Sequence, residues 1–251
     1  MTLSTPMTFK TIALRVDNRD QNIAFYQQTL GLRLLGEENT VAFFSAWNKQ
    51  DQTLIIEESP APDTRAVRGR KKLGKIVIKA EKASDIADLL AGGAAANKIY
   101  KGKNGYAFEA LSPQGDLFLL HAEDSLADLK ESAPPAFLDK NPDFQGLTAF
   151  HFEQLILNVA DPSLSQAFYH DQLLESFPLK IAFTAAKGAD LDIDPSKTWD
   201  IEYLEIAVRP DYDLAKLKKQ LENRGQTVYL DKKEKLLVVS DPSQIEVWFS
   251  K

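Results

Sequence analysis

An internal repeat constrains the fold of this chain more than any other feature of its sequence. Residues 14–30, LRVDNRDQNIAFYQQTL, align without a gap on residues 157–173, LNVADPSLSQAFYHDQL, and the alignment superimposes Tyr26 on Tyr169. A repeat at this spacing indicates two related halves rather than one continuous fold. With 251 residues, of which 44% are hydrophobic, the chain is long enough to bury a core in each half.

The first half opens with a pattern typical of a strand followed by a helix. Apolar and polar residues alternate over 11–17, the period of two expected of a strand with one buried face. Asn18 and Asp20 are suitable N-caps for a helix, and Gly31 is placed to end it. The strand-like stretches VAFFSAW and TLIIEE follow. We therefore predict a module of one strand, one helix and several further strands.

The same order recurs three more times, opening at KIVIKA, QLILNV and IEYLEIAV. The sequence thus predicts an α+β fold of four βαβββ-type modules, paired into two half-barrel domains. We predict a first domain over 1–125, with modules at about 8–60 and 73–124, and a second over 149–251, with modules at about 150–195 and 199–251. The polar, proline-bearing residues 126–148 are predicted to form the linker.

The charge distribution narrows the classes of partner. Residues 1–125 carry 16 Lys and Arg against 15 Asp and Glu, whereas residues 126–251 carry 14 against 21. Neither half has the basic balance of a nucleic-acid-binding protein. No apolar run approaches the ~20 residues of a membrane span, and no signal peptide is visible. We therefore expect no nucleic acid or membrane partner and a cytoplasmic location, with a surface or extracellular one only after unconventional export or release.

At this point a resemblance can be stated. The strand ALRV followed by AFYQQTLGLRLLGEE, and the endings SPQGDLFLL and SDPSQIEVWF, resemble the vicinal oxygen chelate superfamily of glyoxalases, extradiol dioxygenases and bleomycin-resistance proteins. Together with EESPAPDTRAVRGRKKLGKIVIKA, the paired modules resemble the streptococcal CppA family. The resemblance implies the glyoxalase-like fold, with a cleft in each domain. It also implies a proteinase that degrades complement component C3.

The resemblance also implies where metal ligands would stand, on the first and last strands of each module. In the first half those positions hold Thr11, Glu57, Lys75 and Leu119, with His121 on the same face as Leu119. An ammonium group among the ligands repels a cation, so this set favours no metal and we expect no cofactor. A divalent metal is the less favoured alternative. A salt bridge between Glu57 and Lys75 is the simplest structural interpretation.

The second half offers a different set of cleft-facing candidates. The matching positions hold Gln154, Tyr203 and Glu246, and neighbours on the same strand faces add Asn158, Glu205 and Trp248. These side chains can hydrogen-bond and stack, which suits a small polar or aromatic ligand. In the first half, Arg15, Lys75 and Lys79 suit an anionic one.

A basic segment, APDTRAVRGRKKLGK, lies between the first two modules. Apart from Lys75 its cations are Arg65, Arg68, Arg70, Lys71 and Lys72, and Asp63 is its one acid. A loop of this kind can be solvated, can clamp onto the acidic second half, or can capture an anionic ligand or protein surface. The first two interpretations are favoured over the third, because isolated charge clusters rarely bind ligands on their own.

The sequence supplies few parts for the proteinase that the resemblance implies. It has no cysteine, three histidines and no GxSxG motif, and HFEQL at His151 is not the HExxH motif of a zinc protease. His170 is expected on a helix surface. Three hypotheses remain: a C3-degrading proteinase, a metal-independent protein that binds or converts a small anionic or aromatic molecule, and a protein-binding scaffold. Exposed sheet edges also allow a homodimer.

Overall fold

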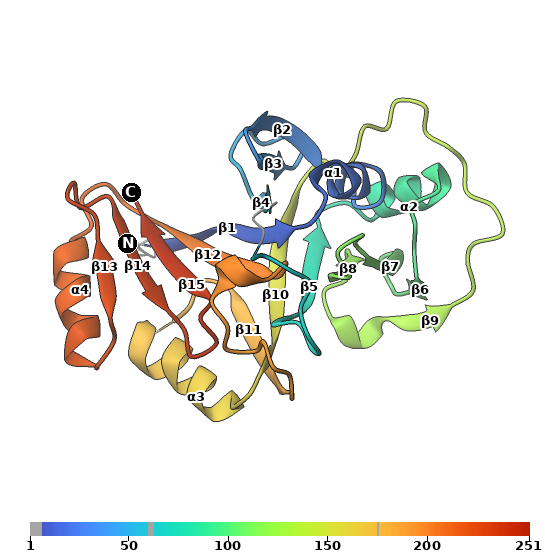
Figure 1. Cartoon of the computed structure of the whole chain (residues 1–251). Helices are drawn as coiled ribbons and strands as arrows, with labels where there is room; N and C mark the ends of the chain where they lie inside the picture. Colours follow the sequence, from blue (N-terminus) through green and yellow to red (C-terminus); the bar gives the residue numbers. More distant parts are fainter. Residues whose placement is uncertain (1–6, 60–62, 175) are drawn as a thin grey trace. The chain divides into compact units, whose positions relative to one another are not determined.

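The computed structural model describes residues 7–59, 63–174 and 176–251 (Figure 1). In chain order its elements are β1 (Met7–Val16), α1 (Arg19–Gln28), β2 (Arg33–Glu38), β3 (Val41–Ser45), β4 (Leu54–Glu58), β5 (Leu73–Ala80), α2 (Ala83–Gly92), β6 (Lys98–Lys101), β7 (Tyr106–Leu111), β8 (Leu117–His121), η1 (Leu126–Asp128), β9 (Lys130–Ser132), β10 (Phe150–Val159), α3 (Pro162–Gln166), η2 (Ala167–Leu173), β11 (Lys180–Ala185), η3 (Pro195–Lys197), β12 (Ile201–Val208), α4 (Leu214–Asn223), β13 (Val228–Leu230), β14 (Leu236–Ser240) and β15 (Glu246–Ser250). The α+β class and the glyoxalase-like fold are confirmed. The order of strand, helix and strands recurs in each module, although the third has the single strand β11 after its helix in the part of the chain described.

The chain divides into two compact units, and each takes segments from both halves of the sequence. Unit 1 comprises Met1–Arg15, Ser59–Lys72 and Leu157–Lys251, and unit 2 comprises Val16–Glu58 and Leu73–Ile156. The unit limits therefore do not follow the predicted boundaries at 125 and 149. In unit 1 the opening strand β1 pairs antiparallel with β12 of the fourth module. In unit 2 the first part of β10, which opens the third module, lies next to β5.

Unit 1 contains a sheet in the order β13-β14-β15-β12-β1. Helix α4 packs against β13 and β14, as Figure 1 shows. Its Leu214, Leu217 and Leu221 are buried, as their helical spacing predicted, and Asp213 caps the helix by accepting from the Lys216 amide. The apolar faces of α4 and the sheet thus form one core, and the opposite sheet face is left for polar and aromatic side chains.

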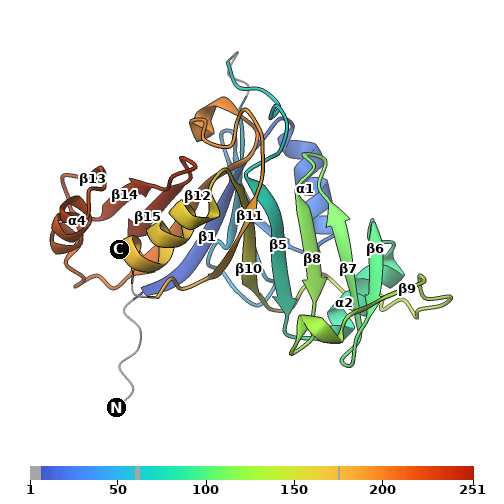
Figure 2. The same ribbon diagram turned by 90° about the horizontal axis from the view of Figure 1, so that it is seen from below.

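Unit 2 contains the strand run β4-β3-β2 and the run β10-β5-β8-β7-β6-β9. Figure 2 shows β5, β8, β7 and β6 side by side. Helix α1 contacts β2, β3 and β4, while α2 contacts β5, β7 and β8. Asn18 caps α1 by accepting from the Gln21 amide, as predicted, and Gly31 adopts a positive φ of 67° just beyond the helix. None of the helices among the described residues is long and apolar enough to cross a membrane.

The repeated AFY sequence packs in the same way in the two units. Tyr26 is fully buried among the rings of Phe25, Phe44 and Phe118, whose centroids lie 5.2–5.7 Å away. Tyr169 is equally buried among Phe168, Phe177 and Phe183, at 5.0–5.5 Å. The repeat therefore preserves an aromatic core contact. The second copy differs in backbone, because α3 continues as the π-helical turn η2 over the AFY residues.

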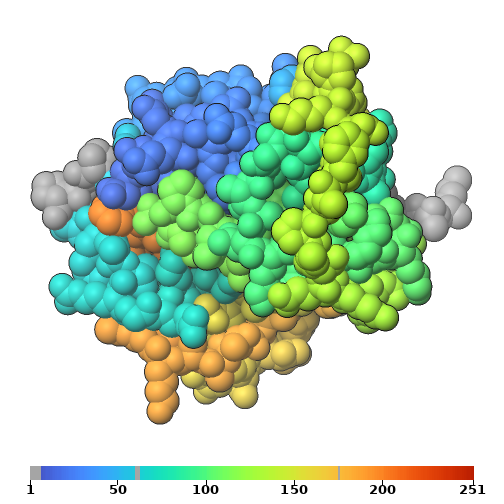
Figure 3. Space-filling model, turned by 90° about the vertical axis from the view of Figure 1, so that its right-hand side faces the viewer, coloured from blue at the N-terminus to red at the C-terminus, as the bar shows by residue number. Residues whose placement is uncertain are grey.

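The segment predicted as a linker, 126–148, has structure of its own. Within it β9 pairs with β6, and the segment runs across the surface of unit 2 in Figure 3. Its end is fixed by backbone hydrogen bonds, from the Leu147 amide to the Gly31 carbonyl at 2.8 Å and from the Trp47 amide to the Leu147 carbonyl at 3.0 Å. A leucine at 147 that is completely buried explains why the chain is held there.

Candidate functional site

One face of the unit 1 sheet gathers five of the predicted site residues. Strand register places Thr11 opposite Glu205 and Glu205 opposite Trp248. The next row along the same face pairs Tyr203 with Glu246. Directly opposed residues point to the same side of a sheet, so these side chains form one cluster, which we call the aromatic face. Its members are Thr11, Tyr203, Glu205, Glu246 and Trp248.

The centre of the aromatic face is a stacked pair of rings. Tyr203 and Trp248 lie with centroids 4.0 Å apart and planes inclined by 3°. The indole Nε1 of Trp248 donates to Oε2 of Glu246 at 2.6 Å, which restrains the orientation of the ring. Both rings are half-buried, so part of each side chain remains exposed. Such a platform can accept a further planar group by stacking.

Glu205 supplies a buried negative charge beside this platform. Its Oε1 accepts from Lys10 Nζ at 2.8 Å and from Ser250 Oγ at 2.6 Å, and the residue is 7% exposed. A charge held this way is compensated within the sheet. Sequence alternation did not identify Lys10, because a register shift between Phe9 and Thr11 brings an even-numbered side chain to Glu205.

The residues of the aromatic face do not fit a divalent metal. The carboxylate of Glu205 is bonded to an ammonium, and that of Glu246 to an indole, so neither is held ready for a cation. Elsewhere among the described residues, no group of three or more histidine, aspartate and glutamate side chains could hold a metal ion.

A second group of predicted residues lies on the sheet of unit 2. Lys79 is directly opposite His121 across β5 and β8. Lys75 Nζ donates to Oε1 of Glu109 at 2.5 Å, so the acid that pairs with Lys75 here is Glu109, which the sequence analysis did not consider. Lys79 pairs with Asp124 at 3.2 Å. Both lysines are thus engaged in ion pairs on this face.

His121 is completely buried and both of its ring nitrogens face partners. Nδ1 accepts from the Glu123 amide at 3.2 Å, and Nε2 lies 3.1 Å from Oε2 of Glu153. Burial lowers the pKa of His121 below its ordinary value, and the carboxylate of Glu153 offsets part of that effect. Nε2 forms no hydrogen bond with any described residue in spite of this proximity, but a completely buried imidazole cannot reach a substrate, so His121 is placed as a structural residue rather than a general base.

Within unit 1, the basic segment forms hydrogen bonds and an ion pair with residues of the second half of the chain. We call this set of contacts the clamp. It corresponds to one of the two interpretations that the sequence favoured. Asp190 is buried and receives two hydrogen bonds from the Arg65 guanidinium, at 2.6 and 2.9 Å, and one from the Arg68 amide at 2.6 Å. The Arg65 bonds are the largest cause that lowers the pKa of Asp190 to about 2. The sequence prediction missed Asp190, because the stretch around it had no clear strand register.

Lys72 is the buried end of this clamp. Its amide donates to Asp200 Oδ2 at 2.6 Å, and its ammonium donates to the Ile193 carbonyl. Burial lowers the pKa of Lys72, while the surrounding aspartates, Asp200 first, act in the opposite direction. The Asn158 side chain donates to the Lys71 carbonyl at 2.9 Å, so Asn158 holds the clamp and is not part of the aromatic face.

The remaining predicted residues are placed apart from the aromatic face. Arg15 forms an ion pair with Glu202 at 2.5 Å. Gln154 lies half-buried on β10 in unit 2, and Glu57 lies half-buried on β4 in the same unit. His170 is exposed, as expected, and His151 is exposed as well.

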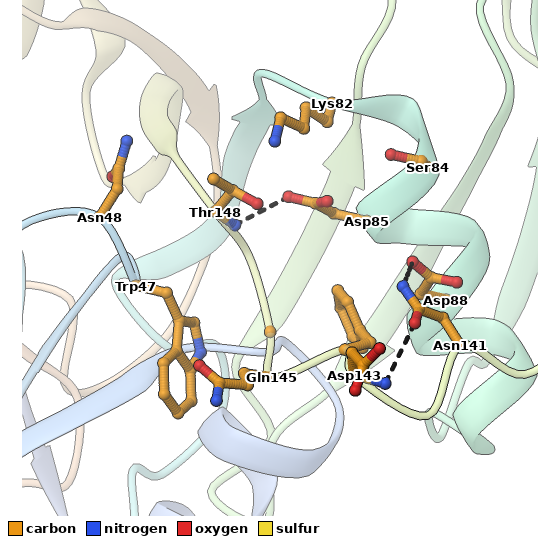
Figure 4. Close-up of a pocket in the computed structure, with 12 residues that line it drawn as sticks. Trp47, Asn48, Lys82, Ser84, Asp85, Asp88, Asn141, Asp143, Gln145 and Thr148 are labelled. Atoms are coloured by element: carbon orange, nitrogen blue, oxygen red, sulfur yellow. Dashed lines mark hydrogen bonds between the residues drawn. The ribbon is translucent and has the colours of Figure 1, made fainter.

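Unit 2 also has a polar surface pocket of about 490 Å³, shown in Figure 4. The start of α2 and the end of the linker segment form it together with Trp47 and Asn48. Asp85 turns toward the Thr148 amide, which donates to it at 2.7 Å, and the Asn141 amide contacts Asp88 at 3.5 Å. These contacts join α2 to the linker segment, so the pocket is explained by anchoring of the chain.

Comparison with known proteins identifies relatives along the whole chain. The family models "CppA N-terminal" and "CppA C-terminal" match residues 9–132 and 147–249. The structure of the cppA protein from Streptococcus pneumoniae TIGR4 is 30% identical, with 98% of this chain and 100% of that chain covered and a TM-score of 0.85. No curated protein matches the sequence.

More distant structures share the fold alone. Glyoxalase I from Zea mays is 14% identical, with 98% of this chain and 92% of that chain covered and a TM-score of 0.59. A putative dioxygenase from Bacillus subtilis subsp. subtilis str. 168 is 12% identical, with 98% and 85% covered and a TM-score of 0.59. The glyoxalase-like architecture expected from the sequence is thereby confirmed.

Proposed function

Because this chain belongs to the CppA family and has the glyoxalase-like fold, we propose that it binds a small aromatic ligand on the aromatic face of unit 1, without a metal. The observation that carries the proposal is the parallel stack of Tyr203 and Trp248 on a sheet face lined by carboxylates. The sequence left open a metal-independent protein that binds or converts a small anionic or aromatic molecule. Of these two ligand classes, the proposal takes the aromatic one.

The exposure of the two rings supports binding rather than packing. In the core of unit 1, aromatic residues such as Phe249 are completely buried, whereas Tyr203 and Trp248 are half-buried. An additional ring placed on this platform would gain a stacking contact of about 0.5–1.5 kcal/mol beyond the area that it buries.

The carboxylates favour a ligand that carries a hydrogen-bond donor or a positive charge. Glu246 receives one hydrogen bond from Trp248, and a carboxylate offers about four acceptor positions. An ammonium group on the ligand can therefore bind Glu246 while its ring stacks on Trp248. The anionic ligand considered from the sequence is disfavoured on this face, because the carboxylates of Glu205 and Glu246 outnumber the ammonium of Lys10 there.

A titration with benzylamine, benzoate and cyclohexylmethylamine, followed by isothermal calorimetry, tests the proposal. We expect benzylamine to bind best, Trp248→Ala to lose binding at least tenfold, and Glu246→Gln to reduce the preference for benzylamine over benzoate. Trp47→Phe, in the other unit, is the matched control and should bind as the wild type does. Equal binding of all three compounds, or unchanged binding by Trp248→Ala, would contradict the proposal.

Degradation of complement C3 stays a prediction of the family resemblance. The histidine closest to acidic side chains, His121, is completely buried, so it cannot reach a substrate to activate a nucleophile. Incubation of purified C3 with the protein and with its Glu57→Gln, Lys75→Ala variant, followed by gel analysis, tests it. Fragments made by the wild type and not by the variant would support a peptidase; no fragments would leave ligand binding as the account of the molecule.

A further inference from the structure

Three exposed cations meet where two loops of unit 1 come together. Gly69 and Gly188 form an isolated antiparallel bridge, and Arg68, Arg70 and Lys187 flank these glycines. We call these three side chains the cationic tip. We infer that the cationic tip is a docking surface for an acidic surface of a partner protein, separate from the aromatic face and independent of the small ligand proposed there.

The backbone beneath the cationic tip is held in place by Asp190 and Arg65, whose opposite charges neutralise each other. Asp190 accepts from the Arg65 guanidinium and from the Arg68 amide, so the charge of Arg65 is satisfied within the unit. The Arg65 carbonyl and amide also bond to Trp199 and Lys197 at 3.0 and 3.1 Å. Figure 3 shows the two segments in contact on one face of the molecule. A surface held in place before binding loses less entropy when a partner docks.

The register of the bridge sets two like charges against each other. In an antiparallel bridge between Gly69 and Gly188, Arg70 lies opposite Lys187. Like charges directly opposite each other are destabilising. The neighbouring stretches 66–71 and 185–189 contain no acidic residue that would offset the repulsion. Carboxylates of a partner would relieve it.

The glycines bring the two loops close enough for these charges to act together. A Cβ added at Gly188 would lie 3.2 Å from the Arg70 amide nitrogen, and one at Gly69 would lie 3.4 Å from the Gly188 Cα. Gly69 also has a positive φ of 90°. Small residues at both positions therefore allow the close approach that concentrates the cations.

The exposure and the chemistry of the side chains indicate the kind of partner. Arg68, Arg70 and Lys187 are all exposed, which suits a macromolecular surface. Arginine binds carboxylates through two parallel hydrogen bonds. The chain as a whole is acidic, with a net charge of −6. A cationic tip on an acidic molecule orients an acidic partner toward one place on the surface.

Fluorescence anisotropy with labelled poly-L-glutamate tests the inference. We expect the wild type to bind this probe at low salt, and we expect Arg68→Ala, Arg70→Ala, Lys187→Ala to weaken binding about tenfold or more, since several charge-assisted contacts are lost. The matched control is Lys216→Ala, Lys219→Ala, Lys232→Ala, which removes the same charge from exposed sites elsewhere in unit 1. Its affinity should stay within about twofold of the wild type.

Three outcomes would overturn the inference. They are no binding of poly-L-glutamate by the wild type, an equal loss in both triple variants, and tighter binding of single-stranded DNA than of polyglutamate at the same salt concentration. Binding of benzylamine by the tip variant should be unchanged, so the test is separate from that of the proposed ligand site.

Discussion

At the residue scale, two aspartates in unit 1 show how differently one side chain can be used. Asp190 is surrounded by donors, and the Arg65 hydrogen bonds hold its pKa at about 2. Asp241 is enclosed in the core next to Tyr169, and burial raises its pKa to about 6 in spite of hydrogen bonds from the Ile245 amide, Tyr169 and the Ser243 amide. The two side chains therefore make the free energy of unfolding depend on pH in opposite directions.

Removal of the Asp190 charge should destabilise the protein. Asp190→Asn weakens the bidentate pair and leaves the Arg65 guanidinium without its counter-charge, which costs about 2–4 kcal/mol of the free energy of unfolding. Urea unfolding at neutral pH measures the loss, and Asp192→Asn, an exposed neighbour, should change little. The pKa of Asp190 is lowered from 3.8, so its stabilising contribution is present above pH 3.8 and is lost as pH falls through about 2. Equal stability of the two variants would contradict this role.

Asp241 should have the opposite pH dependence. Its pKa in the folded state is raised from 3.8 to about 6, so its contribution to stability is greatest below pH 3.8 and is lost as pH rises through about 6. The difference corresponds to about 3 kcal/mol. Asp241→Asn, which can still accept from the Ser243 and Ile245 amides, should gain stability relative to the wild type between pH 4 and pH 8. Thermal melts across that range measure this gain; a constant difference between the two proteins would contradict it.

At the element scale, local pattern predicted most of the strands and helices. The leucine stripe of α4 reflects burial of one face, which a sequence records directly. The period of two over 11–17 predicted the strand β1, but residues 11–16 are all buried, so the expectation of one buried face was wrong. The linker segment was predicted less completely. The segment is attached to unit 2 by backbone hydrogen bonds to Gly31 and Trp47. Backbone hydrogen bonds do not depend on side-chain type, so the amino-acid sequence does not reveal them. The π-helical turn η2 in the second AFY repeat likewise has no signal in the sequence.

Gly146 should be essential for the anchoring of the linker segment. Its φ is 149°, and an added Cβ would lie 2.2 Å from Trp47 Nε1 and 2.3 Å from the Gly31 carbonyl oxygen. Gly146→Ala should therefore lower the free energy of unfolding by about 2 kcal/mol or more, because backbone must move. Gly92→Ala at the end of α2 has open space and should be neutral or stabilising by about 0.5–1 kcal/mol. Chemical denaturation compares the two, and similar stability would contradict the anchoring role.

At the scale of the whole molecule, the sequence predicted four modules but not the composition of the compact units. Hydrophobic periodicity tells which face of a strand is buried and does not tell which strand lies beside it. Thr11 was therefore grouped with Lys75 and His121, whereas the structure places Thr11 opposite Glu205 and assigns the other two to unit 2. Of the candidate site, the fourth-module residues Tyr203 and Glu246 were predicted with their correct neighbours, because they belong to adjacent strands of one module.

This composition predicts that a cut in the linker segment will not separate the two halves of the chain. Unit 1 includes β1 from the first half, and unit 2 includes the start of β10 from the second. A protease site inserted after Lys140 and cleaved should yield two fragments that elute together in gel filtration and separate only in denaturant. Separate elution of folded fragments under native conditions would show that the halves are independent.

The central claim is that the aromatic face of unit 1 binds an aromatic ligand through Trp248, and its most direct test is the indole N–H region of an NMR spectrum. The chain has three tryptophans, Trp47, Trp199 and Trp248, and a Trp248→Phe variant assigns the third signal. We predict that benzylamine shifts the Trp248 signal, whose N–H donates to Glu246, and leaves those of Trp47 and Trp199 in place. A Trp248 signal that does not move while benzylamine binds would contradict the account.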